Sequence, residues 1–172
     1  MRGAIFTEGS TTTDESTETY AEYFEGSFLS VNTVADELSP YCNLELHILS
    51  DNFGYVRGDD QVDTDSVPEK EETEHFVDSL LSNLGDLDVV VLLFTTGVFE
   101  DVITTNWDQI VDNAKEDSIW CIGTSRSALE SINLEPLERD HPVLLYERRG
   151  VARLGTEIRE ELVEHVRTRA DD

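Results

Sequence analysis

The sequence predicts an α/β protein, a three-layer sandwich with a mostly parallel central sheet of about five strands and helices on both faces. Three observations lead to this fold. Strand-like runs alternate with segments of helical periodicity along the whole chain, as in parallel sheets with helical crossovers. Residues 89–94 form a continuous Val, Leu and Phe run, which is typical of a central strand covered on both faces. The chain of 172 residues also fits one compact domain, so we expect residues 1–172 to form a single unit.

Each predicted element rests on a local pattern. Short apolar runs predict the strands, at residues 3–7, 44–49, 89–94, 119–122 and 143–146. Apolar residues spaced three and four apart, together with N-terminal capping signals, predict the helices, at residues 20–38, 68–84, 98–114, 125–132 and 156–169. Gly26 divides the first helix or leaves it whole, Pro68 suits the first turn of the second, and Thr156 is the expected N-cap of the last.

Two polar segments interrupt this pattern. Residues 8–19 are rich in Ser and Thr and have no apolar periodicity, so we expect a flexible loop there. Residues 50–54, Ser-Asp-Asn-Phe-Gly, have turn chemistry, and an acidic loop follows at residues 59–67. The first loop fits a ligand lid and a passive tether equally well.

The charge is strongly acidic. Asp and Glu number 38 against 12 Lys and Arg, which gives a formal net charge of -26. A disordered acidic chain, an acidic decoy for basic partners and a halophilic surface all have this composition. Hydrophobic residues make up 38% and are gathered into runs, which disfavours disorder. At 1 M salt the Debye length is about 3 Å, so we expect a halophilic protein whose self-repulsion is screened.

Several classes of site are not expected. The sequence has no Gly-Lys-Ser/Thr of the Walker type, no GxGxxG and no GxSxG, so it lacks the usual signatures of ATP hydrolysis, dinucleotide binding and the nucleophile elbow. Cys42 and Cys121 are far apart and the four histidines are scattered, so no metal site is predicted, and His47 is interpreted as a satisfied histidine of a strand. The cofactor is left unknown. No apolar run is long enough to span a bilayer and the N-terminus is too polar for a signal peptide, so we expect a cytoplasmic protein without a membrane partner.

Ligands of open α/β sheets bind outside the carboxyl ends of the strands, which directs attention to the loops that follow them. Gly123, Thr124, Ser125 and Arg126 leave a buried strand and enter a helix with hydroxyls, amides and a guanidinium, so they are the predicted phosphate-binding residues. The alternative is structural: Thr124 or Ser125 caps the helix and Arg126 pairs with a nearby carboxylate.

The loop after the central strand is the second candidate. Thr95, Thr96 and Gly97 are predicted to bind substrate, with Gly97 allowing a close approach of the backbone. The alternative is a capped helix start in which the glycine has no role in binding.

The segment 46–56, Leu-His-Ile-Leu-Ser-Asp-Asn-Phe-Gly-Tyr-Val, followed by two aspartates at 59 and 60, resembles the strand and turn of small proteins related to the YaaA peroxide-stress family and to a domain of archaeal tRNA-modifying enzymes. The resemblance implies a sheet-edge position near a nucleotide or nucleic-acid site, beside the loop at Gly123. Because this turn follows a predicted strand, Ser50, Phe53 and Gly54 are predicted to bind substrate and Asp51 to orient or activate a polar group.

The C-terminal part differs in charge from the rest. Residues 139–172 hold seven arginines against eight acidic residues, while residues 1–138 hold thirty acidic and five basic residues. These arginines either face a phosphate backbone or a protein partner, or they pair within the last helix with glutamates three and four residues away.

These observations support three hypotheses. The leading one is a protein that binds or processes a nucleotide or nucleic acid, with phosphate held by the strand-end loops. The second is a non-catalytic interaction protein or homo-oligomer that uses residues 139–172. The third is a small transferase or hydrolase, because this fold alone specifies no chemistry and leaves open whether the chain is an enzyme.

Overall fold

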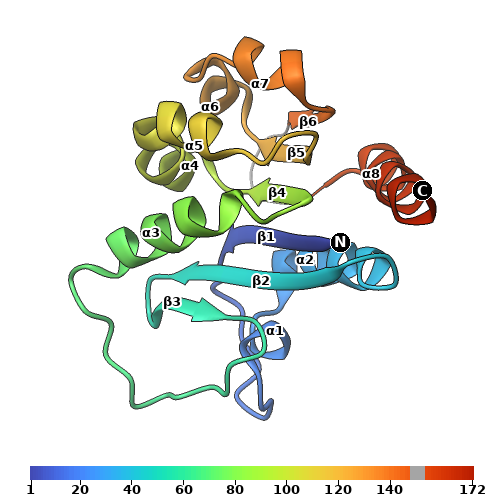
Figure 1. Cartoon of the computed structure of the whole chain (residues 1–172). Helices are drawn as coiled ribbons and strands as arrows, with labels where there is room; N and C mark the ends of the chain where they lie inside the picture. The colour runs from blue at the N-terminus through green and yellow to red at the C-terminus, as the bar shows by residue number, and fades with distance from the viewer. Residues whose placement is uncertain (148–153) are drawn as a thin grey trace.

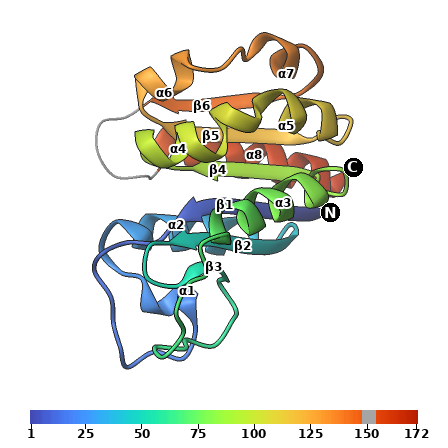
Figure 2. The same ribbon diagram turned by 90° about the vertical axis from the view of Figure 1, so that its left-hand side faces the viewer.

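The computed structural model, which describes residues 1–147 and 154–172, contains a six-stranded sheet of order β3-β2-β1-β4-β5-β6. Five strands are parallel, and β3 pairs antiparallel with β2. Figure 2 shows the strands side by side in this order. The strands are β1 (Arg2–Glu8), β2 (Asn43–Ser50), β3 (Gly54–Arg57), β4 (Val89–Leu93), β5 (Ile119–Thr124) and β6 (Val143–Glu147). The predicted mostly parallel α/β fold is confirmed.

Helices cover both faces of the sheet and complete the three layers (Figure 1). One layer contains α1 (Tyr20–Tyr23), the 3-10 turn η1 (Gly26–Phe28), α2 (Leu29–Leu38) and α8 (Thr156–Asp171). The other contains α3 (Glu72–Leu84), α4 (Thr96–Val102), η2 (Thr104–Asn106), α5 (Trp107–Asn113), α6 (Arg126–Glu130) and α7 (Glu135–Asp140). Alternate residues of β4 point into the two cores, and all five are buried, as a central strand requires.

Several element boundaries differ from the sequence prediction. The first helical segment is divided, because Gly26 has a φ of 63°. The helix predicted from Pro68 begins at Glu72, and the helix predicted over 98–114 is split by η2 into α4 and α5. Thr156 was predicted as an N-cap, but Gly155 holds that position. Strand β3 and helix α7 were not predicted.

The loop that follows β1 is anchored by backbone hydrogen bonds. The Gly9 amide donates to Leu49 O, Asp14 N donates to Tyr23 O, and Glu25 N donates to Thr12 O. Gly9 is required here because a Cβ at this position would lie 2.7 Å from the Phe24 ring. These contacts bring the polar loop against the ends of β2 and α1, while its predicted flexibility stays a prediction.

The strand order creates one special position at the carboxyl edge. The five parallel strands lie in the order β2-β1-β4-β5-β6, which becomes 2-1-3-4-5 when they are numbered along the chain. The chain therefore goes from β1 toward one side of the sheet, to β2, and continues from β4 toward the other side, to β5. The loops after β1 and β4 therefore diverge at the topological switch point, where open α/β sheets bind their ligands. No helix of the described residues is long and apolar enough to cross a membrane.

Candidate functional site

A cavity of about 270 Å³ lies at the switch point between β1 and β4. Its walls come from four places in the chain: the loop after β1, the η1–α2 segment, the turn after β2 and the end of β4. The lining residues are Glu8, Gly9, Ser10, Thr11, Thr12, Ser27, Phe28, Val31, Asp51 and Thr95. The cavity thus combines two carboxyl groups, several hydroxyl groups and an apolar wall.

Glu8 is the most perturbed group of this cavity. It is the last residue of β1, and its carboxylate accepts a hydrogen bond from the backbone amide of Thr95, the N-cap of α4 that follows the neighbouring strand β4. Burial raises the pKa of the Glu8 carboxyl, hydrogen bonds from the backbone and side chain of Thr95 oppose this shift, and the negative charge of Asp51 adds to it. A carboxyl with a raised pKa in a cavity is a typical feature of a functional site.

Asp51 links this cavity to a second one. It is exposed in the turn between β2 and β3 and lines both the switch-point cavity and a cavity of about 300 Å³ on the side of α3 and α4. The second cavity is also acidic, since Glu69, Glu72 and Asp101 line it together with Lys70. Among the predicted site residues, Asp51 is therefore the one that lines both cavities.

The other predicted residues of this turn have structural partners. The Ser50 hydroxyl accepts hydrogen bonds from the amides of Asn52 and Phe53, and it closes the turn. Phe53 is buried, with its ring 5.2 Å from that of Tyr20, and Gly54 has a φ of 69°. The resemblance placed this turn beside the Gly123 loop, but β1 and β4 stand between β2 and β5. Three strand spacings, about 14 Å, separate the two loops.

Of the four predicted phosphate-binding residues, Ser125 and Arg126 have the partners that their structural alternative requires. Gly123 and Thr124 are buried, and the Thr124 hydroxyl has no hydrogen-bond partner among the described residues. Ser125 is the N-cap of α6 and accepts a hydrogen bond from the Ala128 amide. Arg126 is exposed and pairs with Glu130 at 3.0 Å. Contact of these residues with a phosphate stays a prediction.

The loops after β4 and β5 are nevertheless joined at the rim. Thr96 Oγ1 donates to Ser125 Oγ at 2.7 Å, and Ser125 Oγ lies 3.2 Å from Ser127 Oγ, which makes a chain of three hydroxyls beside Arg126. Thr95, the neighbour of Thr96, lines the switch-point cavity. Gly97 is exposed, and an added Cβ would meet nothing within 4 Å, so the backbone is accessible there.

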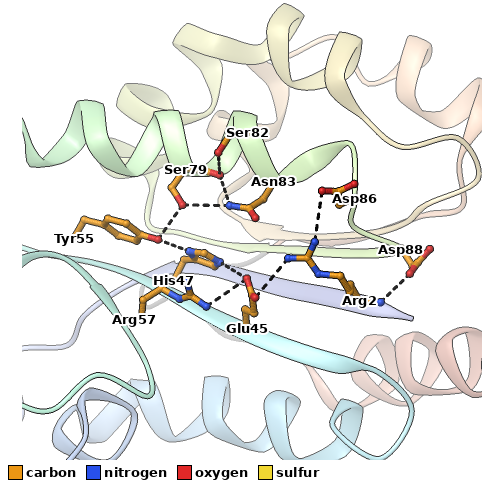
Figure 3. A network of polar contacts seen from close by, with 10 residues as sticks. All are labelled: Arg2, Glu45, His47, Tyr55, Arg57, Ser79, Ser82, Asn83, Asp86 and Asp88. Atoms are coloured by element: carbon orange, nitrogen blue, oxygen red, sulfur yellow. Dashed lines mark hydrogen bonds and ion pairs between the residues drawn. The ribbon is translucent and has the colours of Figure 1, made fainter.

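A polar network lies on the same sheet, under α3 (Figure 3). His47 Nδ1 is 2.6 Å from the Tyr55 hydroxyl, which is 2.9 Å from Ser79 Oγ, and His47 Nε2 is 3.3 Å from Glu45. Glu45 also pairs with Arg2 and Arg57. His47 is fully buried and stacks on Phe6 with ring centroids 4.6 Å apart. These contacts confirm the interpretation of His47 as a satisfied histidine of a strand.

Burial and the positive charge of Arg57 together lower the pKa of His47 to about 4, against the opposing effect of Glu45. The imidazole is therefore neutral in the folded protein at physiological pH. Among the described residues, no group of three or more His, Cys, Asp or Glu side chains could hold a metal ion.

The C-terminal arginines that the structure describes are engaged within the chain. Arg159 pairs with Glu37 at 2.8 Å, Arg167 with Glu164 at 2.6 Å, and Arg139 lies 4.0 Å from Glu135. Arg169 donates to the backbone oxygen of Asp117. Arg148, Arg149 and Arg153 lie outside the described residues. A partner or homo-oligomer contact through residues 139–172 stays a proposal.

Sequence reasoning selected Asp51 and Thr95 but missed Glu8 and the other residues that line the cavity with it. The loop after β1 was recognised as part of the binding rim, but Glu8 was not singled out among 38 acidic residues. Its position as the polar residue that directly ends a buried strand was the available signal, since the carboxyl ends of parallel strands form the ligand-binding edge.

Comparison with known proteins adds little to this description. No protein family and no curated protein matches the chain. A solved structure described as a flavodoxin from the domain Archaea aligns with 99% of this chain and 99% of its own, at 11% identity and a TM-score of 0.42. The fold assignment rests on the strand order, which is the flavodoxin-like 2-1-3-4-5 order of doubly wound sheets.

Proposed function

We propose that this protein binds a nucleotide, or the terminal nucleotide of a nucleic acid, across the switch point of its sheet. The sugar and base side of the ligand enters the cavity at Glu8 and Asp51. The phosphate lies over the loops that follow β4 and β5, against the hydroxyls of Thr96, Ser125 and Ser127 and the guanidinium of Arg126.

The cavity at the switch point carries this proposal. It lies where the loops after β1 and β4 diverge, and Thr95 in its wall is followed directly by Thr96 of the hydroxyl chain. A ligand that fills the cavity and extends past Thr95 therefore reaches the hydroxyl chain without crossing another element. The resemblance of residues 46–56 to proteins with a presumed nucleotide site agrees with this ligand class.

The charges of the two places also favour the neutral part of the ligand in the cavity and its phosphate at the loops after β4 and β5. The residues that line the cavity include two carboxyl groups and neither Lys nor Arg, so a phosphate is repelled from it. The three hydroxyls form a chain beyond Thr95, and Arg126 lies between Ser125 and Ser127 in the sequence, at the start of α6. Guanidinium and hydroxyl groups are common ligands of phosphate. A halophilic setting would favour short-range contacts of this kind, because molar salt screens the net charge of -26.

An Arg126→Ala variant tests the phosphate half. Titration calorimetry in molar KCl would compare adenosine 5′-monophosphate with adenosine. We expect the variant to bind the monophosphate about tenfold more weakly than the parent and to bind adenosine equally well, because one charged contact to phosphate is lost.

Arg139→Ala is the matched control. Arg139 is exposed and lies near a glutamate at the same i, i+4 spacing as Arg126, on a different short helix. Equal affinities of the parent and the Arg126→Ala variant for the monophosphate, or equal losses in both arginine variants, would overturn the proposed phosphate contact.

Asp51 has a place in this proposal as the residue that orients or activates a polar group of the bound ligand. Its exposed carboxylate and the partly buried carboxyl of Glu8 occupy different environments in one cavity, which is the arrangement that separates acid and base roles in enzymes. The reaction that such a pair would catalyse stays open.

A further inference from the structure

We infer that Glu8 selects the sugar of the ligand, so that the switch-point cavity takes a ribosyl group with adjacent hydroxyls in preference to a deoxyribosyl group. This inference rests on the proposed nucleotide site and names the part of the ligand that the cavity recognises. Glu8 would then be a specificity-determining residue.

The hydrogen bonding of Glu8 is the first observation that supports this selection of the sugar. A carboxylate offers about four acceptor positions. Among the described residues, Thr95 alone supplies the hydrogen bonds to the Glu8 side chain, from its backbone amide and its own side chain, which leaves about two acceptor positions. Glu8 is partly buried, so its carboxylate loses part of its hydration, and this desolvation is the main cause that raises its pKa. Remaining acceptor positions in such a place gain most from a ligand that donates hydrogen bonds.

The shape and lining of the cavity are the second observation that supports the selection of a ribosyl group. Its volume of about 270 Å³ lies below the roughly 300 to 1,000 Å³ of pockets that enclose a whole ligand, so it fits one moiety of a nucleotide. Phe28 and Val31 supply an apolar wall, opposite in character to the carboxyl and hydroxyl groups. A ribose has the matching two sides, a carbon face and an edge of hydroxyl donors.

The charge of the cavity is the third observation that supports the selection of a ribosyl group. Asp51 is the second titratable group in the lining, and its charge acts on Glu8. Two carboxyl groups disfavour a phosphate or a carboxylate ligand, and neutral hydroxyl donors carry no such penalty. The sugar hydroxyls of a nucleotide are donors that lie next to its phosphate, so one ligand serves both the cavity and the hydroxyl chain at Thr96 and Ser125.

The test compares ribose with deoxyribose in the full chain. Calorimetric titration in molar KCl would use adenosine 5′-monophosphate and 2′-deoxyadenosine 5′-monophosphate as probes. We expect the parent protein to bind the ribonucleotide about tenfold more tightly, since the deoxy ligand leaves an acceptor of Glu8 without its donor.

A Glu8→Gln variant then separates recognition from structure. The amide oxygen of glutamine can still accept from the Thr95 amide, so the loop contact persists. We expect the preference for ribose to decrease to near unity while the affinity for the deoxynucleotide is retained. A merely structural role of Glu8 would weaken both ligands equally and would overturn the inference. Glu22→Gln makes the same chemical change on the exposed side of α1, outside the cavity lining, and should leave the preference intact.

The failure of the inference and the failure of the proposed function give different results. Equal binding of the two nucleotides by the parent protein, with the Arg126→Ala effect present, overturns the sugar selection and leaves the nucleotide site standing. Absence of binding for both nucleotides overturns the proposed function and, with it, the selection that rests on it.

Discussion

The buried histidine of β2 makes the stability of this protein depend on pH in a way that one substitution removes. His47 is fully buried and its ring stacks with those of Phe6 and Tyr55. Its pKa is lowered to about 4 from 6.5. The unfolded chain therefore takes up a proton on this histidine at a higher pH than the folded chain does. The stability that the neutral His47 preserves is fully present above about pH 6.5 and is lost as the pH falls toward about 4.

The size of the effect follows from these two values. Between about pH 7.5 and about pH 5, the histidine of the unfolded chain takes up nearly one proton and the buried one about a tenth of a proton. This difference lowers the free energy of unfolding by about 2 kcal/mol. A His47→Phe variant loses this contribution, because phenylalanine retains the stacking on Phe6 and has no titrating group.

Urea unfolding in molar KCl, followed by the fluorescence of the buried Trp120 and Trp107, measures the difference. We expect the decrease in stability from about pH 7.5 to about pH 5 to be about 2 kcal/mol smaller in the variant than in the parent. Tyr55→Phe is the control, because it removes the hydroxyl that contacts His47 but retains the imidazole. The same decrease in the parent and in His47→Phe would refute the reasoning.

Three further predictions concern the fold and its charge. Leu92→Ala, in the fully buried centre of β4, should lower the free energy of unfolding by about 3 kcal/mol, and a loss below about 1 kcal/mol in urea unfolding would contradict its central position. Gly54→Ala should lower the free energy of unfolding by about 1 to 3 kcal/mol, because Gly54 has a φ of 69° and an added Cβ would lie 2.5 Å from Glu72. Gly97→Ala is the control, because the space around Gly97 is open, and it should lower the free energy of unfolding by less. The thermal midpoint should increase from low to molar KCl as the charge of -26 is screened, and a flat or decreasing midpoint would contradict the proposed adaptation to salt.

The fold was largely predictable because its strongest signals are local. The apolar run that forms β4 is buried on both faces as expected, and the turn at Ser50 to Gly54 has the hydroxyl contacts that its composition indicates. The hairpin strand β3 was missed because its four residues stand between that turn and an acidic loop, too short to show an alternation. Helix α7 is equally short.

The site was predictable only in part. The rule that ligands bind at the carboxyl ends of parallel strands selected Asp51 and Thr95, which the cavity brings together. The same rule gave no means of separating the loop after β5 from the loop after β2. Only the strand order shows that these loops stand three spacings apart, with β1 and β4 between them.

The sequence by itself determined the α/β class, the parallel sheet and the acidic character of this protein, because hydrophobic periodicity and charge are properties of neighbouring residues. Tertiary structure alone decided which of the 38 acidic side chains line the switch-point cavity. Glu8 differs from the others in its environment: β1 pairs with β4, the Thr95 amide meets its carboxylate, and burial raises its pKa. Desolvation depends on what surrounds a group in space, and strands distant in sequence supply those surroundings.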